Sequence, residues 1–461
     1  MMVERCVACA AAVMLVAVQA DGQARTPNTA PTAPRDCSLQ FRSVMVNGQP
    51  TTTYARFTVG LDRTNDFIGG GVDAFCANTD QRVTADSAEQ LGNERLVYLI
   101  GRVRYTENRV TLAADRMTYY MGEERLVAEG NVVGRTSTGT HFRGPRATYL
   151  RAKAGLRTRS RLDAGGRPDT WISAQDAGTD STKRDSTHVL ADSVISDNDS
   201  LIYARGRVII DRPDLSATAD SAMLDQGREL AALRQSPTVR GKGDSPFTLD
   251  AAEIDIFSRQ RSAERVRSAG NANAKSDEVS LKADTIDLRI ADRKLSRAIA
   301  WGPTRAKATQ TEREITADSI DVRMPGQVIR TMHAIRGARA ESLPDSTKIR
   351  SNERDWFAGD TIEAEFDTTA QSDTSKSVIR LLTSRGSAKS WQQAARENVP
   401  VPDSMPAINY MTGRVIGVEF GDDRQLARVR VTDQVSGVLV QPVADSAKTA
   451  VKPTRPPGGS R

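Results

Sequence analysis

Apolar and polar residues alternate through most of this chain, and the alternation predicts β-strands. Leu126, Ala128 and Val132 fall on one face of an extended segment. Glu129 and Asn131, which lie between them, fall on the other face. Because successive side chains of a strand point to opposite faces, this pattern predicts a strand with one buried and one exposed face. The three-and-four spacing of amphipathic helices is not sustained anywhere, so we predict an all-β protein.

A two-part unit recurs along the chain. Its first half is a strand that carries Ala-Asp followed by Ser, Arg or Thr, and its second half is a strand that ends in a small residue and Gly. Copies of the first half lie at 83–87, 112–116, 189–193, 217–221, 281–285 and 315–319, with looser copies at 250–254 and 357–361. The second half ends at Gly101, Gly130, Gly206, Gly270, Gly337 and Gly386. The constant order predicts an end-to-end array of strand pairs joined by tight polar turns.

The acidic residue of the unit interrupts the alternation. Met117 and Tyr119 follow Asp115 at the second and fourth positions, which would place the aspartate itself on the apolar face. We therefore predict a kink or bulge at this residue, with the carboxylate capping backbone N–H groups. The glycine of the second half would allow a bend or a close approach between strands. Both are structural roles.

The first residues predict export. A short polar start precedes an apolar run from Cys6 to Ala20, and small residues follow it. This is the layout of a secretory signal peptide, which we place at 1–24. A membrane anchor is the alternative, but a bilayer span needs about 20 apolar residues, more than this run provides. We expect the mature protein in the periplasm, either free or associated with the outer membrane.

The rest of the chain divides by composition and repeat density. We expect a linker at 25–36, a first β-repeat block at 37–158, a polar loop or insert at 159–187 and a second β-repeat block at 188–391. A loop at 392–406 and a degenerate terminal β-repeat at 407–441 follow. The tail at 442–461 is rich in Pro, Gly and Lys, a composition typical of disorder.

Composition restricts the kind of interior. Only 38% of the 461 residues are hydrophobic and 5% are aromatic, which favours a thin, extended array over a thick globular core. The net charge of +6 is spread among interspersed basic and acidic residues, so it favours an anionic partner only mildly. We predict no nucleic-acid binding, because that function needs a concentrated basic face with aromatic platforms.

Residues for catalysis or metal binding are not grouped in the sequence. The three histidines, His141, His188 and His333, have no partner at metal-ligand spacing, and no nucleophile elbow or phosphate-binding loop is present. The acidic residues recur once per repeat, as a structural position does. We therefore predict no enzyme, no catalytic residue, no metal and no cofactor. A carbohydrate-active β-helix is an alternative that would need acids clustered on one face.

Two cysteines remain after removal of the signal peptide. Cys37 and Cys76 would form one disulfide in an oxidising compartment. The alternative is a pair of free buried thiols.

The repeat resembles the OstA/LptA family, which carries lipopolysaccharide across the periplasm. The densest match is Leu112–Tyr120 continued by Leu126–Val133. The resemblance is strong over 83–149, fair over 188–338 and faint beyond. It implies an elongated, V-shaped β-jellyroll, a solenoid-like stack of antiparallel strands whose apolar groove shields acyl chains. The chain is more than twice the size of a typical single-domain member, and we expect no long C-terminal barrel like that of the outer-membrane member.

The resemblance also implies a function and site residues. The function would be binding and transfer of a lipopolysaccharide-type anionic lipid between the inner and outer membranes, with other β-jellyroll components as partners through edge-strand pairing. The groove candidates are Val97, Leu99, Met117, Tyr119, Leu126, Ala128, Val132, Ile202, Val208, Leu224, Ile286, Leu288, Ile320 and Val322. Arg102, Arg116, Arg205 and Arg207 are candidates for contact with lipid phosphates at the groove rims. The alternative is a structural envelope or surface repeat protein in which the same apolar residues fill a core without lipid.

Overall fold

The computed structural model describes residues 39–59, 63–77, 79–173, 186–198, 200–243, 246–277, 279–310, 313–344, 346, 349, 351–368, 377–394, 406–421 and 426–441. The predicted signal peptide, the linker, Cys37 and the tail lie outside these residues, as do residues 174–185 and 395–405 of the two predicted loops. Within them the regular structure is β-strand apart from one short 3-10 helix, η1 (Pro325–Gln327). The predicted all-β class is confirmed.

In chain order, a first set of strands ends at Asp197 and a second set begins at Leu201. The first is β1 (Leu39–Arg42), β2 (Met45–Val46), β3 (Gln49–Pro50), β4 (Thr53–Thr58), β5 (Thr64–Gly69), β6 (Val72–Cys76), β7 (Arg82–Ala85), β8 (Ser87–Leu91), β9 (Leu96–Thr106), β10 (Val110–Tyr120), β11 (Arg125–Thr136), β12 (Thr140–Leu150), β13 (Arg161–Gly165), β14 (Asp169–Ile172), β15 (Thr187–Leu190) and β16 (Ser193–Asp197). The second is β17 (Leu201–Asp211), β18 (Leu215–Asp225), β19 (Leu230–Arg234), β20 (Thr238–Gly241), β21 (Thr248–Asp250), β22 (Glu253–Arg259), β23 (Ser262–Lys275), β24 (Ser280–Ala291), β25 (Lys294–Gln310), β26 (Arg313–Arg323), β27 (Thr331–Ser342), β28 (Asp355–Thr368), β29 (Ser377–Ala394), β30 (Ala407–Phe420), β31 (Leu426–Thr432) and β32 (Ser436–Val440).

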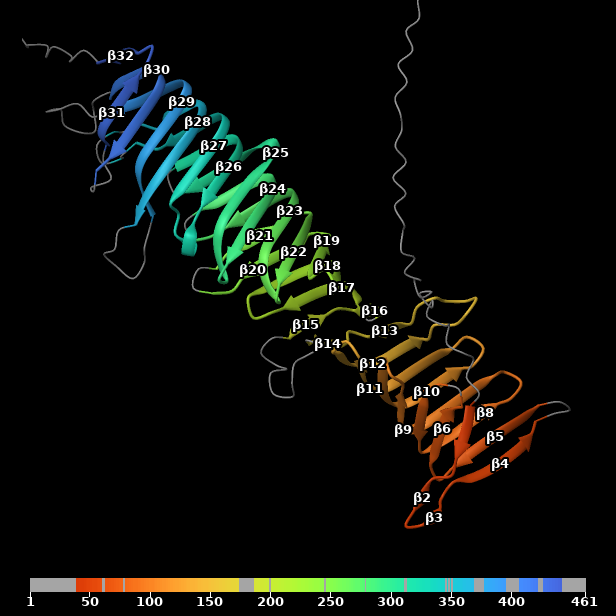
Figure 1. The fold of residues 1–461 in the computed structure, drawn as a ribbon. Helices are drawn as coiled ribbons and strands as arrows, with labels where there is room; N and C mark the ends of the chain where they lie inside the picture. The colour runs from red at the N-terminus through yellow and green to blue at the C-terminus, as the bar shows by residue number, and fades with distance from the viewer. Residues whose placement is uncertain are drawn as a thin grey trace, which may run out of the picture.

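The strands form one elongated antiparallel stack (Figure 1). Thirty of them belong to a single hydrogen-bonded network, and β2 and β3 form a separate hairpin. From β9 to β12 and from β23 to β30, each strand pairs with the preceding and the following strand in the chain. This is the solenoid-like stack of hairpin units that the repeat predicted.

Each layer of the stack is bent in the middle, so the layers form two walls that meet at a corner. In β10, Val110–Ala113 and Arg116–Tyr120 both pair with β11, but the register shifts between them. Elsewhere a layer is split into two short strands, as β13 and β14 are where they pair with the two halves of β12. We call the wall that contains Arg116–Tyr120 wall 1 and the wall that contains Val110–Ala113 wall 2. The hairpin turns at their far ends form rim 1 and rim 2.

The repeat residues build the corner. Gly206 and Arg207 both have positive φ, at 76° and 48°, and the backbone N–H of Asp192 donates to the Gly206 carbonyl over 2.9 Å. Asp192 lies directly over Gly206, where a Cβ would be 2.9 Å from the aspartate Cβ. The kink predicted at the acidic residue is therefore confirmed. The carboxylate, however, accepts from the Arg207 side chain over 2.6 Å instead of capping backbone N–H groups.

The interior between the walls holds two apolar clusters. One extends from Ile68 to Ala164 and the other from Ile172 to Val418. The hydrogen-bonded stack continues across this boundary through β13 and β14. The expectation of a polar loop over 159–187 is thus wrong for residues 161–172. Leu162, Ala164 and Ile172 face inward there, and the many Gly, Asp and Ser residues around them hid this short alternation.

Candidate functional site

The predicted groove residues all lie in the interior, but most of them are packed. All except the half-buried Tyr119 are buried, and Ala128, Ile202, Ile286, Ile320 and Val322 have no exposed surface. Val97, Leu99, Tyr119 and Leu126 line a cavity of only about 30 Å³. The interior around these residues is therefore largely filled, except beside Leu224, which lines a hollow in the middle of the stack.

A larger cavity lies between the walls near the C-terminal end, and none of the predicted groove residues lines it. It has a volume of about 220 Å³. Its apolar lining consists of Val279, Ala308, Ile315, Ile329, Met332, Ala340, Trp356, Phe357, Phe366, Ile379, Leu382, Val418 and Phe420. For comparison, an engineered apolar cavity of about 150 Å³ stays dry and binds benzene. This cavity is thus large enough for a segment of an apolar ligand.

Polar side chains surround the mouth of this cavity, mainly on rim 2. They are Gln310, Arg313, Glu314, Glu341, Ser342, Asp355, Gln392 and Gln393. The Asp355 carboxylate accepts from the backbone N–H of Gln393 over 2.8 Å, and the Gln393 amide donates to the Glu353 carbonyl over 2.9 Å. Burial raises the pKa of Asp355 above its usual value. An apolar interior with a polar border on one side is the arrangement that an amphipathic ligand requires.

Arg313 brings the two rims together at this cavity. It lies at the start of β26 on rim 2, and its guanidinium is 5.7 Å from the ring centroid of Phe420 on rim 1. A cation over an aromatic face is a modest attraction at a partly exposed site. The contact therefore borders the cavity without sealing it.

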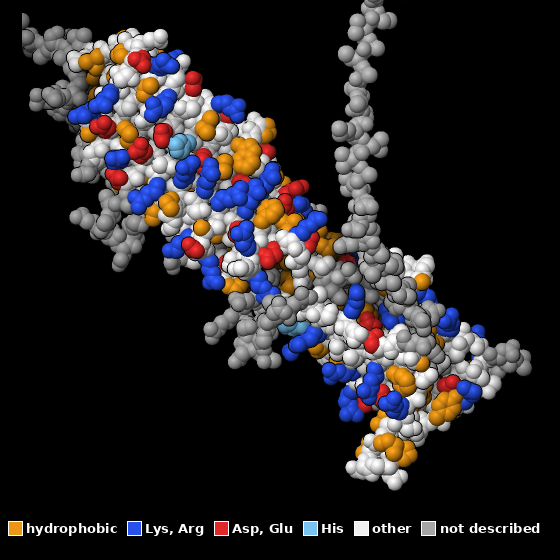
Figure 2. All heavy atoms as spheres, viewed as in Figure 1, with side chains coloured by type: hydrophobic (Ala, Val, Ile, Leu, Met, Phe, Trp, Pro, Cys, Tyr) orange, Lys and Arg blue, Asp and Glu red, His pale blue; other side chains and the backbone are white. Residues whose placement is uncertain are grey.

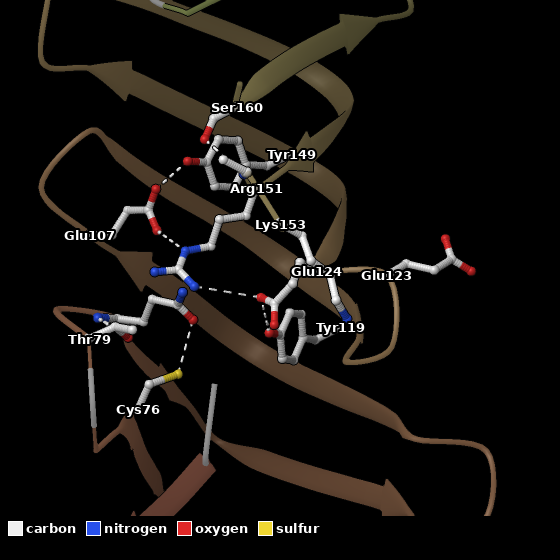
Figure 3. Close-up of polar contacts among 12 residues, drawn as sticks. Cys76, Thr79, Glu107, Tyr119, Glu123, Glu124, Tyr149, Arg151, Lys153 and Ser160 are labelled. Atoms are coloured by element: carbon white, nitrogen blue, oxygen red, sulfur yellow. Dashed lines mark hydrogen bonds and ion pairs between the residues drawn. The ribbon is translucent and has the colours of Figure 1, made fainter. Parts of the chain in front are cut away.

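In the first block, a buried ionic cluster closes the mouth instead (Figure 3). Arg151 on rim 1 lies 3.3 Å from the Glu107 carboxylate on rim 2 and 3.8 Å from Glu124 on rim 1. The three side chains are only 9%, 6% and 4% exposed. With its amide oxygen toward the guanidinium, Gln81 of rim 2 accepts from Arg151 as well. The rims are thus held together by charged groups that are removed from water.

Tyrosine hydroxyls complete this cluster. Tyr105 donates to Glu107 over 2.8 Å, Tyr149 donates to the other Glu107 oxygen, and Tyr119 donates to Glu124 over 2.7 Å. Burial, reinforced by the neighbouring carboxylates, raises the pKa of Tyr105 and of Tyr119. The hydroxyls therefore remain protonated donors at neutral pH, and the buried carboxylates stay hydrogen-bonded.

A second polar contact joins the rims in the middle of the stack. Arg212 and Asp214 on rim 2 form a buried pair at 3.0 Å. The Arg212 guanidinium donates to the Ser258 hydroxyl over 3.0 Å, and the Asp214 carboxylate accepts from the backbone N–H of Ala263 over 2.7 Å. Ser258 and Ala263 flank a hairpin turn of rim 1. A hollow of about 370 Å³, with Leu224 in its lining, lies beside this contact.

The four arginines predicted for the rims lie elsewhere. Arg102 and Arg207 are at the corner, on the opposite edge of the layers from the mouth, where they pair with Asp86 and Asp192. Arg116 and Arg205 are exposed on the outer face of wall 1 beside the corner, and neither joins an ion pair within the described part. The sequence predicted a bend beside these arginines, but it did not show that the bend lies on the opposite edge of each layer from the mouth.

Cys76 is disulfide-bonded. Its expected partner, Cys37, lies outside the described residues, so the pairing stays a prediction. Among the residues that the structure describes, no group of His, Cys, Asp and Glu is arranged to hold a metal ion. No helix in the described ranges is long and apolar enough to cross a membrane.

The site residues that sequence analysis missed share one signal. Trp356, Phe357, Phe366 and Phe420 line the C-terminal cavity. They come from the last repeats, where the motif is degenerate and the alternation is hard to align. Only 5% of the residues in this chain are aromatic. The concentration of large aromatic side chains in the last repeats was therefore the one sequence signal that could have indicated a site there.

Part of the chain is similar to a solved periplasmic protein. LptH from Pseudomonas aeruginosa, the LptA homologous periplasmic component of the conserved lipopolysaccharide transport device, is 20% identical in sequence. The match covers 26% of this chain and 82% of LptH, with a TM-score of 0.22. No protein-family model matches the chain, and no curated protein matches it.

Proposed function

We propose that this chain binds an amphipathic anionic lipid of the lipopolysaccharide type in the periplasm and passes it between the inner and outer membranes without chemical change. The observation that carries this proposal is the C-terminal cavity, with its apolar lining and its polar border. Each methylene group buried there would contribute about 0.8 kcal/mol to binding. The repeat's resemblance to the OstA/LptA family supports the same class of ligand.

The two polar contacts between the rims define where lipid binds at rest. The Arg151 cluster and the Arg212 pair close the mouth in the first block and in the middle of the stack. The cavity at 279–420 is therefore the resting site in this proposal. Transfer along the whole stack would require the rims to separate at both contacts.

The ends of the stack supply surfaces for the proposed partners. Within the described residues, β31 and β32 hydrogen-bond only to β30, and β1 and β4 pair only with β6 and β5. Val438, Leu439 and Val440 on β32 are more than half exposed. Open strand edges of this kind accept a further strand, so we propose that other β-jellyroll components of the envelope extend the stack there.

A structural role without lipid is the second candidate. The tight packing of nearly all the predicted groove residues favours it for the first block and the middle of the stack. A structural repeat protein would need no cavity with a polar border. The two functions therefore differ in what occupies the C-terminal cavity.

Photo-crosslinking in the native host separates these candidates. A photoreactive residue at Leu382, which lines the cavity, should capture an acylated lipid that mass spectrometry detects. The matched control is the same residue at Met117, which is buried in the filled first block. An adduct at Leu382 alone supports the proposal. No acylated adduct at Leu382 in a folded protein contradicts it and favours the structural role.

A further inference from the structure

Four arginines stand side by side on the outer face of wall 1. Arg265 of β23 is directly opposite Arg289 of β24, which is opposite Arg297 of β25. Arg297 is in turn opposite Arg323 of β26. Neighbouring strands are about 4.8 Å apart, so the four guanidinium groups cover roughly 14 Å across the sheet. We call Arg265, Arg289, Arg297 and Arg323 the arginine ladder.

Like charges directly opposite each other destabilise a sheet, and two aspartates offset part of this repulsion. Asp287, only 3% exposed, lies 3.1 Å from Arg289 and accepts from the Nε of Arg265 over 2.9 Å. Asp321 accepts from the Nε of Arg297 over 2.7 Å. These aspartates hold the guanidinium groups in one row on the face of the sheet.

The aspartates leave an excess of positive charge. Exposed Arg267, directly opposite Asp287, adds a fifth arginine, and Asp255, which lies opposite Arg267 on β22, is paired with Arg234 over 2.7 Å. Arg323 joins no ion pair within the described part of the chain, and Arg289 and Arg297 keep side-chain exposures of 45% and 42%. Lys and Arg side chains gather on the visible face over the middle of the stack in Figure 2.

The unused donors of the ladder fit phosphate groups. Arg265 and Arg297 bond their aspartates through Nε and Nη2, which leaves Nη1 out of those bonds. A guanidinium carries five N–H donors, and arginine binds phosphate oxygens with particular strength. Arginines at regular spacing on a sheet face present these donors in one plane.

We propose that the arginine ladder docks the protein on a membrane surface through the phosphate groups of anionic lipids. The position of the ladder, close to the rim 1 ends of its four strands, supports this occupant. Arg323 ends β26 at rim 1, and Ile329, a few residues later, lines the C-terminal cavity. Docking through the ladder would place that cavity beside the lipid headgroups. The inference goes beyond the proposed cavity ligand and stands without it, because it concerns the outer wall.

Nucleic acid is the other polyanion to consider, and the ladder does not favour it. Binding of single strands relies on aromatic platforms on which bases stack. The aromatic ring beside the ladder, Phe257, has the Arg265 guanidinium 5.4 Å from its centroid, so this face is already covered.

Vesicle sedimentation tests the proposal on the full chain. The variant Arg289→Gln with Arg323→Gln removes two ladder charges and leaves the Arg265 and Arg297 hydrogen bonds to aspartate intact. The control, Arg116→Gln with Arg205→Gln, makes the same charge change on the same wall. Each arginine near an anionic surface contributes about 1 kcal/mol, so the ladder variant should bind phosphatidylglycerol vesicles roughly 10- to 30-fold more weakly.

The control variant and the neutral vesicles should give different results from the ladder variant. The control variant should bind phosphatidylglycerol vesicles as the unmodified chain does, and none of the proteins should bind phosphatidylcholine vesicles. Equal losses in the ladder and control variants would overturn the proposal, as would unchanged binding in the ladder variant. Ladder-dependent binding to double-stranded DNA without binding to vesicles would also overturn it. Circular dichroism of each variant verifies that the fold is retained, and a lipid-free cavity would leave the vesicle result unchanged.

Discussion

Arg151 and Glu107 form an ion pair across the mouth of the first block. Their charged atoms are 3.3 Å apart, and the side chains are 9% and 6% exposed. Arg151 lies on rim 1 and Glu107 on rim 2, so the pair joins the free ends of the two walls. Such a contact makes the first block a closed structure, in contrast to the cavity near the C-terminus.

Breaking this pair should destabilise the first block. Arg151→Met leaves Glu107 and Glu124 buried without their cation, and loss of one partner of a buried pair costs about 3–5 kcal/mol. Hydrogen exchange of the β9–β12 amides should show a corresponding loss of protection. Arg102→Met is the control, because its pair with Asp86 is exposed and screened by water, so its loss should change the stability little. Equal losses in the two variants would contradict a closing role for Arg151.

The local structure, meaning the strands and the bend in each layer, could be predicted from the sequence alone. The alternation predicted the strands, and the order of Asp and Gly predicted the bend in each layer, because both signals lie within one hairpin unit. Asp192 and Gly206 show this well: the aspartate covers the glycine at the corner, as a repeated kink requires. The inward direction of residues such as Ile202 and Ile320 follows from the same period of two.

The candidate sites depend on contacts between units, and these were not predictable. Arg151 contacts Glu107 only because the two rims lie close together at this point. No short sequence pattern predicts how far apart the rims are. Interspersed charges likewise suggested an evenly mixed surface. Antiparallel register instead places Arg289 and Arg297, which lie on two successive strands of the chain, directly opposite each other in one row. The cavity arises from large side chains in repeats whose motif had degenerated.

Gly206→Ala should destabilise the corner. The φ of Gly206 is 76°, a region that costs an L-residue about 1–2 kcal/mol, and the new Cβ would meet Asp192. We expect a loss of at least that size in urea unfolding. Gly417→Ala is the matched control, since nothing lies within 4 Å of a Cβ there and its φ is not positive. There we expect a neutral or stabilising effect of up to about 1 kcal/mol. Equal effects at the two glycines would rule out the special role of the corner position.

Substitutions at two alanines of β27 should show, through their effects on stability, whether the cavity is empty space. Ala340 lines the cavity, whereas Ala338, two residues earlier on the same face, is 1% exposed and packed in the core. Ala338→Leu should cost about 1–3 kcal/mol by overpacking. Ala340→Leu should cost less than about 1 kcal/mol or stabilise, because its added atoms enter empty space. Thermal unfolding of the two variants compares them directly. The reverse order would mean that the cavity does not exist in solution.

The half-buried Asp355 carboxyl should make the stability of the cavity region depend on pH. Burial raises its pKa in the folded protein above the unfolded value of 3.8, so its contribution to stability is full below pH 3.8 and falls as pH rises through the folded pKa. Asp355→Asn keeps an oxygen for the Gln393 N–H and removes the buried charge. The variant should therefore gain stability at pH 7, by less than about 1 kcal/mol at this half-exposed site, and match the unmodified chain near pH 3.

Asp66 provides a control of opposite sign. A hydrogen bond from Arg56 lowers the pKa of this carboxyl, so its contribution is present above pH 3.8 and is lost as pH falls through the folded pKa. Asp66→Asn should therefore lose stability at pH 7. Hydrogen exchange of β28–β30 for Asp355 and of β4–β5 for Asp66, at both pH values, reports each effect locally. If Asp355→Asn also lost stability at pH 7, the ionised carboxylate would be stabilising the cavity mouth, and the buried-charge explanation would be wrong.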